Sequence, residues 1–211
     1  MKTVLIWEKL QLNNQKIVTS DEIKEYARQL GRDELDVIRY LQRHAYIDRI
    51  FRGYFYVKSY DEHRRKSFDF PILDIIAMGL KAKGVKNWYF GLGTALKLNN
   101  MTHEYFTTDF VITDSYRTTK IIEIFGQRFQ FIKWHGGHFN EDWIIKRKLT
   151  RYSNPQKTVL DLAYRRYIKA RDENYIPGPI KEYENMLASH DLEKYLRIYP
   201  PLFCQIVEDY L

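Results

Sequence analysis

The chain has 211 residues, of which 45% are hydrophobic and 29% charged, a composition that allows a buried core and differs from that of a disordered protein. No apolar run approaches the roughly 18–20 residues that a membrane-spanning helix needs, and the apolar stretch at residues 4–7 is too short for a signal-peptide core. Cys204 is the single cysteine, so no internal disulfide can form, and we expect a cytoplasmic protein with no metal, no cofactor and no membrane contact.

The net charge is +7, and the basic excess lies in the first two thirds of the chain. Residues 1–66 carry 14 Lys and Arg against 10 Asp and Glu, whereas residues 151–211 carry 9 of each. A basic surface attracts phosphate polymers by Coulomb steering, but the same charge also serves solubility alone. The placement of the cations therefore has to decide between these two interpretations.

The first two predicted elements are helices. Residues 4–12 can form the first, with Leu5 and Leu10 among its apolar positions. Residues 20–31 place apolar side chains at the spacing of an amphipathic helix, and Thr19 with Glu22 has the spacing of a capping box.

A third helix follows after only three residues, Gly31 to Asp33, and a connection this short forces a sharp corner. Asp33 suits the N-cap of this helix, and its apolar positions are Leu35, Ile38 and Leu41. Residues 46–51 and 54–58, rich in aromatic and β-branched types, predict a hairpin that turns at Arg52-Gly53. Three helices and a hairpin in about 60 residues predict a winged helix-turn-helix.

The fold class is therefore α+β, with a winged helix-turn-helix at residues 1–60, a charged linker at 61–68 and a mixed α/β domain at 69–211. The second domain is expected to open with a helix over 70–80, a strand over 87–91 and a short helix over 92–98. Its other predicted strands are 107–113, 120–125 and 127–134, with Gly126 as a hairpin turn, and its helices start at 155, 180 and 192, the last broken at Pro200-Pro201.

The most specific functional hypothesis places the third helix in the major groove of double-stranded DNA. That groove admits one α-helix, whose outward side chains reach the base edges, while helix N-termini face phosphates. A basic hairpin can lie along the backbone or in the minor groove. A solvated helix face is the alternative. The expected DNA-binding residues are Thr19, Ser20, Arg32, Arg39, Tyr40, Arg43, Arg49, Arg52 and Lys58.

Catalytic interpretations are weaker, and we expect no catalytic residue. The turn at residues 91–94 lacks the third glycine of a dinucleotide site and the Gly-Lys-Ser/Thr of a P-loop. Asp109 lacks the second carboxylate that a nucleotidyltransferase places nearby, and Gln130 stands where a nuclease needs an acid. His135 and His138 have no nearby third ligand, so they are expected to be exposed loop residues.

The order and spacing of several segments resemble the AbiEi-type antitoxins, transcriptional regulators of type IV toxin–antitoxin systems. The similar segments are residues 19–57, 88–96, 110–113, 129–132 and 153–162. The resemblance implies a two-domain repressor that binds the operator of its own operon and counters a nucleotidyltransferase-like toxin without lasting direct contact. Residues from about 170 onward match nothing in the family.

Two other function classes stay open on the sequence, and a homodimer is compatible with it. One is a nucleic-acid- or nucleotide-processing enzyme, a nuclease or a nucleotidyltransferase, that a winged helix directs to its substrate. The other is an adaptor that uses the winged helix for protein contact. The regulator hypothesis predicts salt-sensitive DNA binding, the enzyme hypothesis metal-dependent turnover that needs Asp109, and the adaptor hypothesis no DNA binding.

Overall fold

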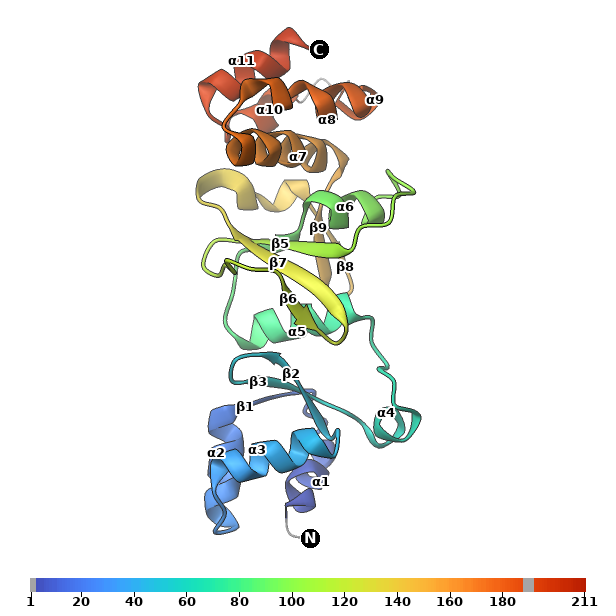
Figure 1. Cartoon of the computed structure of the whole chain (residues 1–211), viewed down its shortest axis with the longest axis vertical. Coiled ribbons are helices and arrows are strands. Elements are labelled where there is room, and N and C mark those ends of the chain that lie inside the picture. The colour runs from blue at the N-terminus through green and yellow to red at the C-terminus, as the bar shows by residue number, and fades with distance from the viewer. Residues whose placement is uncertain (1–2, 188–191) are drawn as a thin grey trace. The chain divides into compact units, whose positions relative to one another are not determined.

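A computed structural model describes residues 3–187 and 192–211 as a mixed α+β protein (Figure 1). Its chain divides into two compact units. The first comprises residues 1–86 and 124–126, and the second comprises residues 87–123 and 127–211. None of the described helices is both long and apolar enough to cross a membrane.

The first unit contains five helices and a three-stranded sheet in its described residues. Their bounds are α1 Val4–Leu12, β1 Ile17–Thr19, α2 Ser20–Gln29, α3 Glu34–Arg43, β2 Ile47–Phe51, β3 Tyr54–Val57, α4 Tyr60–Arg65 and α5 Ile72–Ala82. The sheet order is β1-β3-β2, and both pairings are antiparallel. The predicted hairpin is confirmed, and β1, which the sequence did not predict, extends it to three strands.

The sheet of the first unit is buried on both faces. Phe55 and Val57 face a core that contains the buried side chains of α1, α2 and α3. On the other face α5 packs closely, because Gly79 has no side chain: a Cβ there would lie 2.9 Å from Ile50 and 3.0 Å from Phe51. Only the edges and the turn of the hairpin are left for other contacts.

The segment expected to be a linker, residues 61–68, is instead mostly helix α4, which is tied to the sheet by Glu62. Ser59 caps α4, and the buried Glu62 carboxylate accepts hydrogen bonds from the Ser59 N–H at 2.7 Å, the Asp69 N–H at 2.7 Å and the Tyr56 hydroxyl at 2.6 Å. The first compact unit consequently extends to Lys86 rather than ending near residue 60.

The second unit is built on a mixed six-stranded sheet with the order β6-β7-β5-β4-β9-β8. β5 pairs with β7, and β4 with β9, in parallel; β4 with β5 and β8 with β9 are antiparallel. The strand and helix bounds are β4 Trp88–Phe90, α6 Leu92–Leu98, β5 Thr108–Thr113, β6 Ile122–Ile124, β7 Gln127–Lys133, β8 Ile144–Arg147, β9 Thr150–Ser153, α7 Pro155–Ala170, α8 Pro177–Glu182, α9 Glu184–Leu187, α10 Leu192–Leu196 and α11 Pro201–Asp209. Three short 3-10 helices span Gly136–Phe139, Glu141–Trp143 and Glu173–Tyr175.

Most predicted elements of this unit are confirmed, but the sequence did not predict β8 and β9. The helix expected over 180–189 is divided into α8 and α9, and its last two residues lie outside the described residues. The break at Pro200-Pro201 is confirmed, with Pro201 opening α11.

Two residues of the first unit do not lie on the buried helix faces to which the sequence pattern assigns them. Leu5 of α1 is 50% exposed and Leu35 of α3 is 58% exposed.

A fully buried ion pair lies inside the second unit. The Lys157 ammonium pairs with the Asp161 carboxylate one helical turn further along α7, and both side chains are completely buried. Lys157 also donates to the Tyr89 hydroxyl at 3.1 Å and lies 3.3 Å from His138 Nδ1. The hydroxyls of Tyr89 and Tyr199 donate to Asp161 at 2.8 and 2.6 Å.

Burial alone would raise the pKa of Asp161, but the Lys157 ammonium and His138 hold it below the usual value of 3.8. The ion pair therefore connects β4, α7 and the segment before α11 through hydrogen bonds that satisfy both charges. A buried pair of this kind is costly to break, because removal of one partner leaves an unpaired charge away from water.

We predict that Lys157→Met lowers the free energy of unfolding by about 3–5 kcal/mol, because it leaves the Asp161 carboxylate without its ammonium partner. The double variant Lys157→Met/Asp161→Asn removes both charges and should regain most of that loss. Urea denaturation of the full chain, followed by circular dichroism, measures both. Equal losses in the single and the double variant would contradict this role of the pair.

The second prediction concerns Glu62. Its burial would raise its pKa, but the N–H groups of Asp69 and Ser59, the Tyr56 hydroxyl and Lys16 together lower it below 4.5. A carboxylate whose pKa is lowered in the folded state stabilises the fold at pH values above its ordinary pKa. This contribution is lost as the pH falls through the pKa of the folded state.

Hydrogen exchange at the Ser59 and Asp69 amides should therefore accelerate below pH 4.5 in the wild type, relative to the intrinsic rate. Glu62→Gln should lack most of this acid-dependent change; an unchanged acid response would contradict the assignment.

Candidate nucleic-acid interface

The corner between α2 and α3 is built as the sequence predicts. Leu30 ends α2, and Gly31 adopts a φ of +62°, a left-handed conformation that glycine adopts without a steric penalty. The Arg32 N–H donates back to the Ala27 carbonyl at 2.9 Å, which closes the last turn of α2. The Asp33 carboxylate then accepts the Leu35 and Asp36 N–H groups at 2.9 and 3.2 Å and so caps α3.

Helix α3 has one buried and one exposed face. Val37, Ile38 and Leu41 are buried in the core of the first unit. Arg39 and Arg43 are exposed, and their spacing of four residues places them on the same face of the helix. The Arg39 guanidinium lies 3.5 Å from the Asp36 carboxylate, but both side chains are 75% exposed, so the ion pair is weak and leaves Arg39 available to a stronger partner.

Tyr40 begins an aromatic cluster at the end of α3. Its half-buried ring lies 4.1 Å from the His44 ring, and Tyr46 stacks on Trp7 at 4.4 Å between centroids. His63 of α4 stacks on Tyr46 at 4.7 Å, and its Nε2 lies 2.9 Å from the His44 carbonyl oxygen. These contacts fix the C-terminal end of α3 against α1 and α4.

Two of the three predicted hairpin cations are exposed. Arg49 lies over the Phe55 ring at 5.7 Å, and Arg52 lies in the turn before Gly53. Lys58 does not match the prediction. Its side chain is only 10% exposed, its ammonium is 2.7 Å from the Asp48 carboxylate, and it lies over the Phe68 ring at 5.1 Å. A cation neutralised in this way inside the fold presents no charge to DNA.

Thr19 and Ser20, expected to face phosphates at the start of α2, are engaged within the fold. The Thr19 side chain and N–H form a complete capping box with Glu22. The Ser20 N–H donates to the Gly53 carbonyl at 2.9 Å, which joins the start of α2 to the hairpin turn. Of the nine predicted residues, the structure leaves Arg32, Arg39, Arg43, Arg49 and Arg52 as exposed cations of one compact unit.

The turn at residues 91–94 in the second unit joins β4 to α6 and is bonded to β5. Gly91 precedes α6, and the Thr94 hydroxyl bridges to β5: it donates to the Asp109 carboxylate at 3.0 Å and accepts the Phe110 N–H at 2.7 Å. The Lys97 ammonium lies 2.8 Å from the same carboxylate. Asp109 is thus paired with a cation, which opposes a metal ion at this position.

The two histidines that follow β7 lie in different environments. His135 is exposed, whereas His138 is buried against Lys157, so the expectation of two exposed loop residues was wrong for His138. Among the described residues, no group of three or more His, Cys, Asp and Glu is close enough to hold a metal ion.

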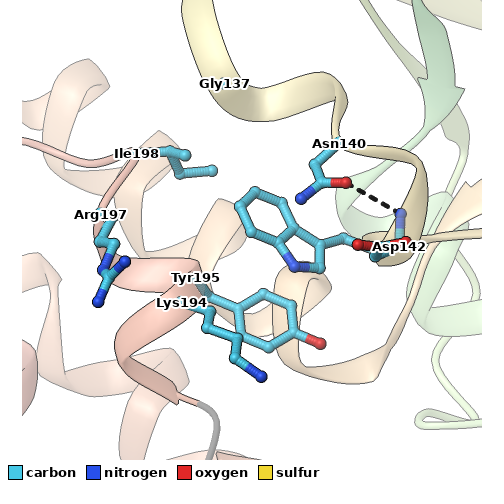
Figure 2. A pocket seen from close by; sticks show the side chains of 8 residues that line it. Gly137, Asn140, Asp142, Lys194, Tyr195, Arg197 and Ile198 are labelled. Atoms are coloured by element: carbon cyan, nitrogen blue, oxygen red, sulfur yellow. Dashed lines mark hydrogen bonds between the residues drawn. The ribbon is translucent and has the colours of Figure 1, made fainter.

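An open pocket of about 570 Å³ lies in the second unit (Figure 2). Two of its lining residues, Trp143 and Tyr195, stack on one another with 5.1 Å between ring centroids. Arg197 and Asp142 lie on opposite sides of the pocket in this view. The charges of the wall therefore have mixed sign, and they define no class of ligand. The lining residues are Gly137, Asn140, Asp142, Trp143, Lys194, Tyr195, Arg197 and Ile198.

The charged pair that sequence reasoning missed is Lys157–Asp161. Its signal was the i, i+4 spacing of opposite charges that flank Thr158, Val159 and Leu160 in a helix predicted to be apolar on one face. Such a pair is usually assigned to a solvated surface. Only the tertiary structure places both groups in the interior.

Comparisons with known proteins show that the chain is similar in fold to a solved structure. No protein-family model matches the chain, and no curated protein sequence matches it. Among solved structures, the crystal structure of the RV2827C protein from Mycobacterium tuberculosis is similar, with a TM-score of 0.59 and 13% sequence identity. The match covers 98% of this chain and 74% of that one, so the two proteins share a fold over nearly the whole of this chain.

Proposed function

We propose that the first unit is a winged helix-turn-helix that binds double-stranded DNA, with α3 in the major groove and the β2–β3 hairpin as the wing. The observation that carries the proposal is the pair Arg39 and Arg43, exposed on one face of a helix whose opposite face is buried. Arginine can bind guanine O6 and N7 through two hydrogen bonds, and it also pairs with phosphates.

Three features around α3 support this placement. Asp33 and Gly31 fix the corner, so α3 projects at a defined angle from α2. Arg32 adds an exposed cation directly before Asp33, the N-cap of α3. Arg52 occupies the hairpin turn, which the Ser20 N–H attaches to α2. The sheet is covered by α5, so only the edge and the turn of the wing are available to DNA.

We further propose that the chain is a transcriptional regulator and the autorepressing antitoxin of a type IV toxin–antitoxin system. This part rests on the resemblance of residues 19–162 to AbiEi-type antitoxins, and it assigns the antitoxin role to the second unit. The counterpart would be a nucleotidyltransferase-like toxin that is countered without lasting contact. The enzyme alternative is less well supported, because Lys97 occupies the one carboxylate, Asp109, on which it depended.

We predict that Arg39→Ala/Arg43→Ala weakens binding to the DNA upstream of the chain's own gene by at least about 1 kcal/mol for each specific contact, and that it reduces the preference for this DNA over random DNA. Fluorescence anisotropy with both DNA duplexes at several salt concentrations measures the two effects. The matched control is Arg64→Ala/Lys66→Ala, which removes the same charge from exposed positions at the end of α4.

The control variant should keep the preference for the upstream DNA. Equal effects of the two double variants would mean that only net charge matters, and α3 would not be the reading helix. A wild-type chain that binds neither duplex at low salt would refute the DNA-binding proposal altogether.

The antitoxin proposal has a separate test. If a neighbouring gene encodes a nucleotidyltransferase-like protein whose expression stops growth, we expect co-expression of the wild-type chain to restore growth. Arg39→Ala/Arg43→Ala should restore growth equally well, because the antitoxin role is assigned to the second unit. Failure of the wild type to restore growth at matched expression would contradict the antitoxin role and leave DNA binding unaffected.

A further inference from the structure

A strongly basic hairpin lies at the edge of the sheet of the second unit. β8 is the outermost strand, and β8 and β9 are joined by the two residues Lys148 and Leu149. The hairpin, residues 144–153, carries four cations and no acidic residue: Lys146, Arg147, Lys148 and Arg151.

Two of these cations are neutralised locally and two are not. Lys146 and Arg151 both pair with the carboxylate of Glu141. Arg147 and Lys148 are exposed, and none of the ion pairs found in residues 3–187 and 192–211 involves either of them. Two adjacent unpaired cations therefore protrude at the tip of the hairpin.

Protection of a sheet edge explains only part of this charge. A charged side chain on an outermost strand prevents edge-to-edge association, and Lys146 within β8 serves that purpose. Arg147, the last residue of β8, and Lys148, the first residue of the turn, add a second and a third positive charge next to it, and like charges repel one another. A polyanion that spans both positions relieves this repulsion and releases its own counterions.

We propose that the tip of the β8–β9 hairpin is a second DNA contact, in which Arg147 and Lys148 bind backbone phosphates. The proposal rests on the proposed DNA binding of the first unit and adds a sequence-independent contact from the second. The Arg147 guanidinium can donate two hydrogen bonds to one phosphate, and the Lys148 ammonium acts as a point charge. Such a contact would add affinity and leave the choice of sequence to α3.

The test is the salt dependence of DNA binding by the full chain. The logarithm of the binding constant falls linearly with the logarithm of the salt concentration, and the slope changes by about 1 for each phosphate that is no longer neutralised. Arg147→Ala/Lys148→Ala should reduce the magnitude of the slope by about 2. It should also weaken binding to the upstream DNA and to random DNA by the same factor, so that the preference between them is unchanged.

The matched control is Arg166→Ala/Lys169→Ala, which removes the same charge from exposed positions of α7 in the same unit. It should leave the slope close to that of the wild type. Equal slope changes in the two double variants, or an unchanged slope in the hairpin variant, would overturn the inference. In that case the proposed function still stands if Arg39→Ala/Arg43→Ala loses its preference for the upstream DNA. Absence of DNA binding by the wild type refutes both proposals.

Discussion

The second unit is organised around a positive and a negative charge that have no access to water. Lys157 and Asp161 are tolerated in the interior because each has several polar partners: the ammonium contacts Asp161, Tyr89 and His138, and the carboxylate accepts the hydroxyls of Tyr89 and Tyr199. Because those partners come from β4, the 3-10 helix after β7 and the segment before α11, the pair can be satisfied only when all of these are in place. This requirement selects one packing of the helical part on the sheet.

The first unit is small, and yet it exposes a cationic face of a helix, α3. A sheet of three short strands gains little stability alone, so both of its faces are covered, one by α1 to α3 and the other by α5. Glu62 and His63 of α4 then attach the end of β3 and the end of α3 to this core. These contacts hold α3 in place while Arg39 and Arg43 stay exposed on its outer face.

The two proposals divide DNA binding between units according to chemistry. The cations of α3 lie on a helix that can approach base edges, and so they are assigned sequence preference. Those of the β8–β9 tip lie at the end of β8 and in the two-residue turn that follows it, which has no aromatic or amide side chain, and so they are assigned phosphate contact.

Local patterns in the sequence determined the helices of the first unit, the capping box at Thr19, the cap at Asp33 and the central strands, because each depends on residues within a few positions of one another. Burial could not be predicted in the same way. The sequence did not distinguish Lys58 from Arg52, or Lys157 from the exposed cations of the same helix, since their exposure depends on Asp48, Phe68 and Asp161 in the folded chain. It likewise did not show that residues 60–65 form a helix attached through Glu62, or that β1, β8 and β9 complete the sheets. Short strands and buried charges are stabilised by partners far along the chain, and only the tertiary structure brings those partners together.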